Sequence, residues 1–251
     1  MKTAIFKNLG LLVILFLISS CIKDDDDSNI QCSNNCTLIK GRIFKADGKG
    51  IENIEISLHY WLKDKFAYIK RKIGKAFTDS NGNYKMNVFL YDTEIGNSSG
   101  ILELRIRYDN IEVSLTNNFL KPSDFSKYLN TEYDVYRIKN ITNKEVTLEI
   151  DYFIPYKSKK STIALNNYNP INEHDGFSFW LYFPYGFPNN YKVPIIKERF
   201  ANTTNNTFSF KSIVGKNRLF VTKKKNGVTE KIEEEIEILN KNDSLNLIYN
   251  Y

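Results

Sequence analysis

Residues 78–90 read Thr-Asp-Ser-Asn-Gly-Asn-Tyr-Lys-Met-Asn-Val-Phe-Leu, and this stretch decides the fold predicted for the first half of the chain. It begins as a turn, because Gly82 permits a left-handed backbone and the side chain of Asp79 or Asn81 can accept hydrogen bonds from the turn's own amides. From Tyr84 onward an apolar side chain stands at every second position, which is the period of a half-buried strand. The stretch therefore predicts a turn that leads into a strand, with Tyr84 entering a core.

The same alternation of apolar and polar residues continues on both sides of this stretch. Residues 46–50 are a second turn signal, because Asp-Gly supplies a positive φ at little cost. Strands are expected at residues 38–44, 54–62, 68–77, 84–90, 102–108 and 146–154, with one or two helical turns at 122–130. The strand at 146–154 would close a first β-module, which ends at Pro155.

Four pieces of this half resemble a carboxypeptidase regulatory-like domain. They are the Lys40-Gly41-Arg42-Ile43 strand, the Asp47-Gly48 turn, the run from Gly50 to Ile54 and the Thr78-to-Tyr84 turn. The resemblance implies a transthyretin-like, seven-stranded β-sandwich. It covers residues 37–90 well and thins out towards 155, where residues 94–100 and 114–143 look like insertions. It implies no peptidase activity, because the zinc ligands of a metallocarboxypeptidase lie in a catalytic domain that this chain lacks.

Residues 157–251 predict a second β-domain. Strands are expected at residues 162–165, 177–183, 208–210, 218–225, 228–239 and 245–249, and Asn226-Gly227 is the preferred type I′ turn of a hairpin. Several short strands with regular turns favour a sandwich, here immunoglobulin-like or fibronectin-like. The predicted fold class is all-β, with two β-sandwich domains in tandem at residues 37–156 and 157–251.

The first 20 residues have the pattern of a secretory signal peptide. Lys2 and Lys7 precede an apolar run from Leu9 to Ile18, which is about half the length of roughly 20 residues that a transmembrane helix needs. Ile18-Ser19-Ser20-Cys21 then resembles a bacterial lipobox, which implies cleavage before Cys21 and acyl chains on its sulfur and its amine. The alternative is an ordinary secreted protein in which Cys21 is incidental.

An acidic run follows the cysteine at Asp24 to Asp27. A block of like charges repels itself, so residues 21–36 are expected to form a flexible tether. Lys23-Asp24-Asp25-Asp26 also resembles the export signal of Bacteroidetes surface lipoproteins. The resemblance implies an outer-membrane lipoprotein that faces the cell exterior, with the membrane itself as a partner through the lipid anchor.

Cys32 and Cys36 remain as a pair once Cys21 carries lipid. An oxidising compartment favours a disulfide between them, although free thiols or a metal site are alternatives. A metal is disfavoured because structural zinc needs four ligands, and His59 and His174, the two histidines of the chain, are both far away in sequence.

Composition excludes several function classes. Hydrophobic residues at 42% and charged residues at 25% are normal for a globular protein with a real core. The basic runs Lys223-Lys224-Lys225 and Lys70-Arg71-Lys72 are expected on solvated faces, and no motif predicts a nucleic-acid partner.

No catalytic motif stands out, and no cofactor or metal is expected. Glu173-His174-Asp175 is interpreted as a polar loop, with a metal site or a proton relay as the alternative.

Two further features are candidate functional sites. If Phe177, Phe179, Leu181 and Phe183 face the core, then Trp180 and Tyr182 face outward, where they could contact a ligand. The alternative is that this second face packs on the first domain. Asp243-Ser244-Leu245 resembles the Bacteroidetes O-glycosylation motif, which makes Ser244 a candidate acceptor.

Three functional hypotheses follow. The first is a non-enzymatic surface lipoprotein whose sandwich modules bind, display or scaffold a glycan or a protein. The second is a hydrolase, or the accessory subunit of a surface system that degrades glycans or peptides, for which the residue 173–175 and 233–235 runs hold the densest acids. The third is an adhesion or assembly subunit.

Overall fold

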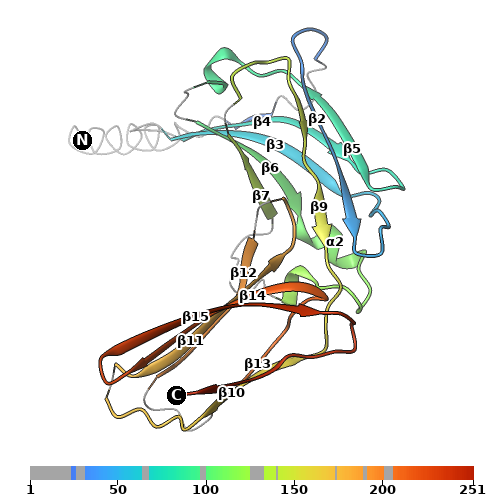
Figure 1. Ribbon diagram of the computed structural model, residues 1–251. Helices are drawn as coiled ribbons and strands as arrows, with labels where there is room; N and C mark the ends of the chain where they lie inside the picture. Colours follow the sequence, from blue (N-terminus) through green and yellow to red (C-terminus); the bar gives the residue numbers. More distant parts are fainter. Residues whose placement is uncertain are drawn as a thin grey trace, which may run out of the picture.

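The computed structural model describes residues 24–26, 32–63, 68–96, 100–124, 133–139, 141–172, 174–188, 191–200 and 206–251. The regular secondary structure of the described residues is nearly all β-strand, which confirms the predicted all-β class. Its strands fall into two groups, one formed before residue 155 and the other after residue 160 (Figure 1). A search of the described residues for a long apolar helix of membrane-crossing length found none.

The first group contains two sheets. One has five strands in the order β1-β4-β3-β6-β7, and the other pairs β5, β2 and β8, with β9 also paired to β2. The strands are β1 (Asp24–Asp26), β2 (Thr37–Lys45), β3 (Glu55–Lys63), β4 (Tyr68–Phe77), β5 (Asn83–Val88), β6 (Ile101–Arg107), β7 (Tyr133–Ile138), β8 (Thr147–Glu149) and β9 (Tyr152–Ile154). Short helices are η1 (Asp92–Glu94), α2 (Tyr108–Val113) and η2 (Pro122–Asp124). The two sheets pack closely, since a Cβ added at Gly74 of β4 would lie 2.8 Å from Val88 of β5.

The turn at residues 78–84 has the predicted form. Gly82 has a φ of +79°, and the Asp79 carboxylate accepts hydrogen bonds from the amides of Asn81 and Asn83 at 2.8 and 2.9 Å. The hydrogen bond from the Asn83 amide is the largest cause that lowers the pKa of Asp79. Tyr84 enters the core and donates its hydroxyl proton to the Ile150 carbonyl, so the turn motif is joined to the far end of this half.

Arg42 connects the two predicted turns. Its guanidinium donates to the carbonyl oxygens of Gly48 at 2.7 Å and Asn81 at 2.8 Å. One side chain on β2 therefore holds both turns against the same end of the sandwich, which gives a physical reason for the Lys-Gly-Arg-Ile pattern.

Three predictions about this half were wrong in detail. Residues 146–154 form two short strands rather than one, because the Asp151 carboxylate accepts the Arg42 amide at 2.8 Å and interrupts the pairing between β8 and β9. The region 114–143 is more than an insertion, since it contains β7, which pairs with β6. Residues 21–36 are not all a flexible tether, because β1 pairs in parallel with β4. Of the helical turns expected at 122–130, residues 122–124 form η2 and the others lie outside the described residues.

The second group also contains two sheets. Their orders are β13-β10-β16 and β12-β11-β14-β15. The strands are β10 (Ser161–Asn166), β11 (Gly176–Pro184), β12 (Tyr191–Phe200), β13 (Thr207–Phe210), β14 (Gly215–Lys225), β15 (Val228–Ile238) and β16 (Asn246–Asn250). The predicted hairpin joins β14 to β15, with positive φ at both Asn226 and Gly227. The sheets meet through aromatic rings, as in the 5.2 Å contact between the ring centres of Phe179 and Phe210.

The two groups of strands share a buried junction. The amide and carbonyl of Gly186, which follows β11, exchange hydrogen bonds with those of Phe153 in β9 at 2.7 and 2.9 Å. Next to this bridge, the ring of Phe187 lies edge-on to Tyr152 at 5.0 Å and also contacts Tyr136 of β7. The junction is therefore packed like a core.

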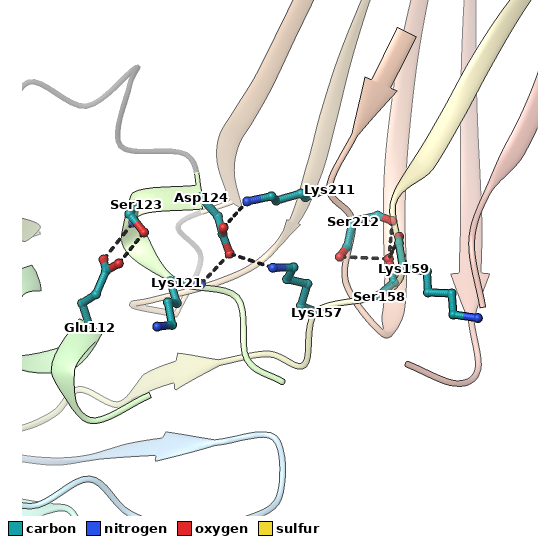
Figure 2. Close-up of polar contacts among 9 residues, drawn as sticks. All are labelled: Glu112, Lys121, Ser123, Asp124, Lys157, Ser158, Lys159, Lys211 and Ser212. Atoms are coloured by element: carbon teal, nitrogen blue, oxygen red, sulfur yellow. Dashed lines mark hydrogen bonds and ion pairs between the residues drawn. The ribbon is translucent and has the colours of Figure 1, made fainter. Parts of the chain in front are cut away.

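A polar cluster reinforces the junction (Figure 2). Asp124 of η2 accepts the Lys121 amide at 3.0 Å and forms ion pairs with Lys157 and with Lys211, which follows β13. Beside it, the hydroxyls of Ser158 and Ser212 are hydrogen-bonded at 2.6 Å. The chain that crosses between the two groups is thus held by contacts to both of them.

Candidate functional site

The outer face of the β12-β11-β14-β15 sheet carries the best candidate site. Along β11, Phe177, Phe179, Leu181 and Phe183 are buried, as their period of two predicts. Trp180 points the other way and is 45% exposed, although β11 is an inner strand of its sheet. The alternative prediction, that this face packs on the first domain, is wrong at Trp180, because that side chain is exposed.

Two more rings extend this surface. Phe220 of β14 lies directly opposite Trp180 in the strand register, and Tyr182 lies edge-on to Phe220 with ring centres 5.0 Å apart. Both rings are half-buried. Trp180, Tyr182 and Phe220 are called the aromatic strip below. Because the three residues are on β11 and β14, whose pairing is continuous from Gly176 to Tyr182, the strip is held in place before any ligand arrives.

Charged side chains border the aromatic strip. The Arg218 guanidinium lies 5.5 Å above the Phe220 ring and pairs with Glu233 of β15. The next carboxylate on the same face of β15, Glu235, accepts a hydrogen bond from Lys216 at 2.9 Å, and this interaction holds its pKa below the ordinary value. An apolar surface with hydrogen-bonding groups at its edge suits a ligand that has both apolar and hydroxyl faces.

Asp175 has a structural position that the sequence did not reveal. Its side chain is buried and accepts the backbone amides of Ile171 at 2.9 Å and Asn172 at 3.3 Å from its own loop. It also accepts the Asn226 amide at 2.9 Å, which ties the loop to the β14–β15 turn. These hydrogen bonds hold the pKa of Asp175 below its ordinary value, and the bond from the Ile171 amide has the largest effect.

Of the other two members of that sequence run, the structure describes one. His174 is exposed on the loop, and Glu173 lies outside the described residues. Across the described parts of the chain, no group of three or more His, Cys, Asp and Glu side chains is arranged to hold a metal ion. His174 and Asp175 lie in a loop, as interpreted from the sequence.

The two basic runs differ in how deeply their side chains are buried. Lys223 and Lys225 are half-buried on β14, where Lys223 pairs with Glu230 at 2.7 Å. In the other run, Lys70 and Lys72 are half-buried while Arg71 is only 5% exposed, so the prediction of a solvated face was wrong for Arg71. The period of two along β4 turns the middle residue inward, where Glu94 neutralises it.

The remaining predicted residues lie at the ends of the chain. The structure joins Cys32 to Cys36 in a disulfide with Cα atoms 5.8 Å apart, whereas Cys21 lies outside the described residues. Ser244 is half-buried in the β15–β16 loop and accepts a hydrogen bond from Asn246, so its role as a glycan acceptor stays a prediction.

Phe220 is the member of the strip that sequence reasoning missed. The hairpin turn at Asn226-Gly227 fixes which residues of β14 and β15 pair, but nothing in the sequence says that β14 also pairs with β11. The alternation in residues 218–225 was the available signal, and it left Phe220 without a partner until the register was known.

Comparison of the sequence with family models found no match, and comparison with curated proteins found none either. The carboxypeptidase regulatory-like domain therefore stays a prediction.

Comparison with solved structures found loosely similar β-rich proteins. The chain is 11% identical to the Bacillus anthracis TIE protein, covering 86% of this chain and 34% of that one at a TM-score of 0.30. It is 12% identical to a Streptococcal ancillary pilin, covering 88% of this chain and 63% of that one at a TM-score of 0.31. A DUF3823 family protein from Parabacteroides merdae is 10% identical, with 82% and 98% covered and a TM-score of 0.23. Similarities this loose carry no functional argument.

Proposed function

We propose that this protein is a lipid-anchored cell-surface protein whose β-sandwich modules bind a glycan and do not catalyse a reaction. The aromatic strip carries the proposal. Trp180 is exposed on an inner strand of its sheet with two further rings beside it, and covering it with a ligand would remove apolar surface from water.

The border of the strip favours a glycan over a flat protein surface. A sugar ring presents C–H groups to an aromatic face and hydroxyls around its rim, and here Arg218, Glu233 and Lys216 stand at that rim. The non-catalytic part of the proposal is supported by the interactions of the acidic residues that the hydrolase hypothesis would need. Asp175 uses its carboxylate to accept backbone amides, and Glu235 is paired with Lys216 on a strand of the sheet.

The anchoring part rests on the sequence. The charged start, the apolar run to Ile18 and the lipobox-like Ile18-to-Cys21 segment support acylation of Cys21 and, with the following acidic run, display outside the cell. Mass spectrometry of the native protein tests it, with acyl chains expected on Cys21. A bare thiol, or a retained starting methionine, would refute this part.

A glycan array probed with the mature chain tests the binding part. Replacing Trp180 with alanine should weaken binding at least fivefold, because a lost ring contact is worth about 1 kcal/mol. Phe77→Ala is the matched control, since Phe77 is an exposed ring, 50% accessible, on β4 of the other half. An array without any hit, or equal losses for the two variants, would contradict glycan binding by the strip.

A further inference from the structure

One face of the five-stranded sheet carries a group of lysines and arginines. The register of β3, β4, β6 and β7 places Ile56, Leu58 and Leu104 toward the core, so their strand neighbours lie on the opposite, outer face. The basic residues on this outer face are Lys70, Lys72, Lys75, Arg105, Arg107 and Arg137, and the carboxylates that β3 and β6 place on it are Glu55 and Glu103. These residues are called the basic face below.

Aromatic rings are interleaved with these cations. The Trp61 ring lies 4.6 Å from the Arg105 guanidinium carbon and 5.3 Å from Lys70 Nζ. The Tyr133 ring lies 5.7 Å from the guanidinium carbon of Arg107. Side chains that combine an apolar body with a charged or polar tip are the ones that settle at a lipid–water boundary.

The carboxylate in the middle of the basic face is already neutralised. Glu103 is buried and pairs with Arg105 at 2.7 Å and Arg137 at 3.5 Å. The side chain of Arg137 is 64% exposed, and Lys75 is also exposed. Arg107 pairs with Asp109 at 3.4 Å, and β1 brings Asp24 and Asp26 to the edge of the sheet opposite Lys70 and Lys72. The exposed positive charge of the basic face therefore lies at Lys75 and Arg137.

The free edge of this sheet is next to the proposed lipid anchor. β1 pairs in parallel with β4, with Asp24 opposite Lys70 and Asp26 opposite Lys72. Cys21 precedes Asp24 by three residues, and three residues of fully extended chain span at most about 10 Å. Acyl chains on Cys21 would hold this edge of the sheet against the membrane.

We propose that the basic face is a membrane-docking surface that lies on anionic lipid head groups beside the inserted acyl chains. The proposal rests on the acylation of Cys21 put forward above. Its two arguments are the cations on β4, β6 and β7 and the proximity to Cys21, which comes from the pairing of β1 with β4. Anionic head groups attract each nearby lysine or arginine, and salt screens this attraction. The docked protein has one orientation, in place of swinging on a flexible tether.

The first experiment uses the mature chain with Cys21→Ser, so that it binds without its lipid. It is sedimented with vesicles of equal parts phosphatidylcholine and phosphatidylglycerol, and with vesicles of phosphatidylcholine alone. We expect salt-sensitive binding to the anionic vesicles. The triple variant Lys72→Gln, Lys75→Gln, Arg137→Gln should weaken partitioning by about tenfold or more.

A matched control separates this face from net charge. Lys159, Lys160 and Lys241 are exposed lysines of the second half, and changing all three to glutamine alters the charge equally. We expect that variant to bind vesicles within about twofold of the parent. Equal losses for both triple variants, or no binding to anionic vesicles, would overturn the proposal. Binding of soluble polygalacturonate in place of vesicles would also overturn it, in favour of an acidic polysaccharide as the occupant.

The second experiment uses the two tryptophans of the chain as reporters. The acylated protein is placed in vesicles whose lipids carry brominated chains, with either Trp61 or Trp180 replaced by phenylalanine. The fluorescence of Trp61 should be quenched and that of Trp180 should not. Equal quenching of the two, or none of Trp61, would overturn the docked orientation. A bare Cys21 in the native protein would refute anchoring alone, because the first experiment does not use the lipid.

Discussion

Arg71 lies between two lysines in the sequence, yet its guanidinium is buried. Its Nη1 donates to both carboxylate oxygens of Glu94 at 2.6 and 2.7 Å, and the ring of Tyr91 lies 4.2 Å from its guanidinium carbon. Glu94 also accepts the Tyr91 amide at 2.9 Å. A buried ion pair of this kind adds little stability over an apolar pair, but either member is costly to leave alone.

Replacing Glu94 with glutamine should therefore destabilise the protein by about 3–5 kcal/mol, because it removes the negative charge that pairs with the buried Arg71 guanidinium. Urea denaturation of the mature chain measures the change. Glu149→Gln is the control: Glu149 pairs with Lys40 at the surface with a side chain 68% exposed, and its loss should cost at most about 0.5 kcal/mol. Similar losses for the two variants would show that burial does not set the cost.

The strands that sequence reasoning found and missed differ in a physical way. Strands with strict alternation, such as β3, β5 and β11, were predicted within a few residues because one face is wholly apolar. β7 was missed because it turns Asp134 inward, where Tyr152 of a distant strand donates to the carboxylate at 2.9 Å. β12 was missed because Pro194 interrupts its pattern, and proline is tolerated there since β12 is an edge strand.

The candidate site, like the strands, was predicted only in part from the sequence. Alternation along β11 placed Trp180 and Tyr182 on the outer face, but whether that face is open depends on what packs against the sheet. Phe220 depends on which strands are neighbours. Both are properties of the tertiary fold, and a period of two within one strand does not contain them.

Gly41 is the point where β2 meets the strands that close the first half. A Cβ added there would lie 1.9 Å from the Ile150 carbonyl oxygen and 2.9 Å from the Tyr84 hydroxyl. Gly41→Ala should therefore separate β2 from β8 and cost about 3 kcal/mol in urea denaturation. Gly227→Ala meets no atom within 4 Å and changes only a position with φ of +77°, so it should cost about 1 kcal/mol. A smaller loss for Gly41→Ala than for Gly227→Ala would contradict the close approach.

At the scale of the molecule, the predicted domain boundary at residue 156 crosses a packed junction. The segment after β11 that carries Gly186 and Phe187 lies among Tyr136, Tyr152 and Phe153 of the first half. The position of a boundary along the chain is set by where the strands of one sheet end. Whether two modules unfold independently depends on what is buried between them. Here aromatic rings are buried between the two halves.

Phe187 is the residue through which this coupling can be tested. It is 2% exposed, and the ring contacts described for it are with residues of the other half. The unsubstituted protein should unfold in a single calorimetric transition, because the unfolding of either half exposes the aromatic rings that the two halves share. Phe187→Ala should remove about 3–5 kcal/mol of packing at the junction and resolve two transitions.

Phe179→Ala is the matched control for calorimetry, because Phe179 is as deeply buried but packs on Phe208 and Phe210 within the second half. It should lower the midpoint by a similar amount and keep one transition, since the junction is intact. Two transitions in the parent, or one in Phe187→Ala, would mean that the halves are stabilised separately. The orientation proposed for the basic face would then hold for the first half alone, and the aromatic strip would be carried by a module free to move beside it.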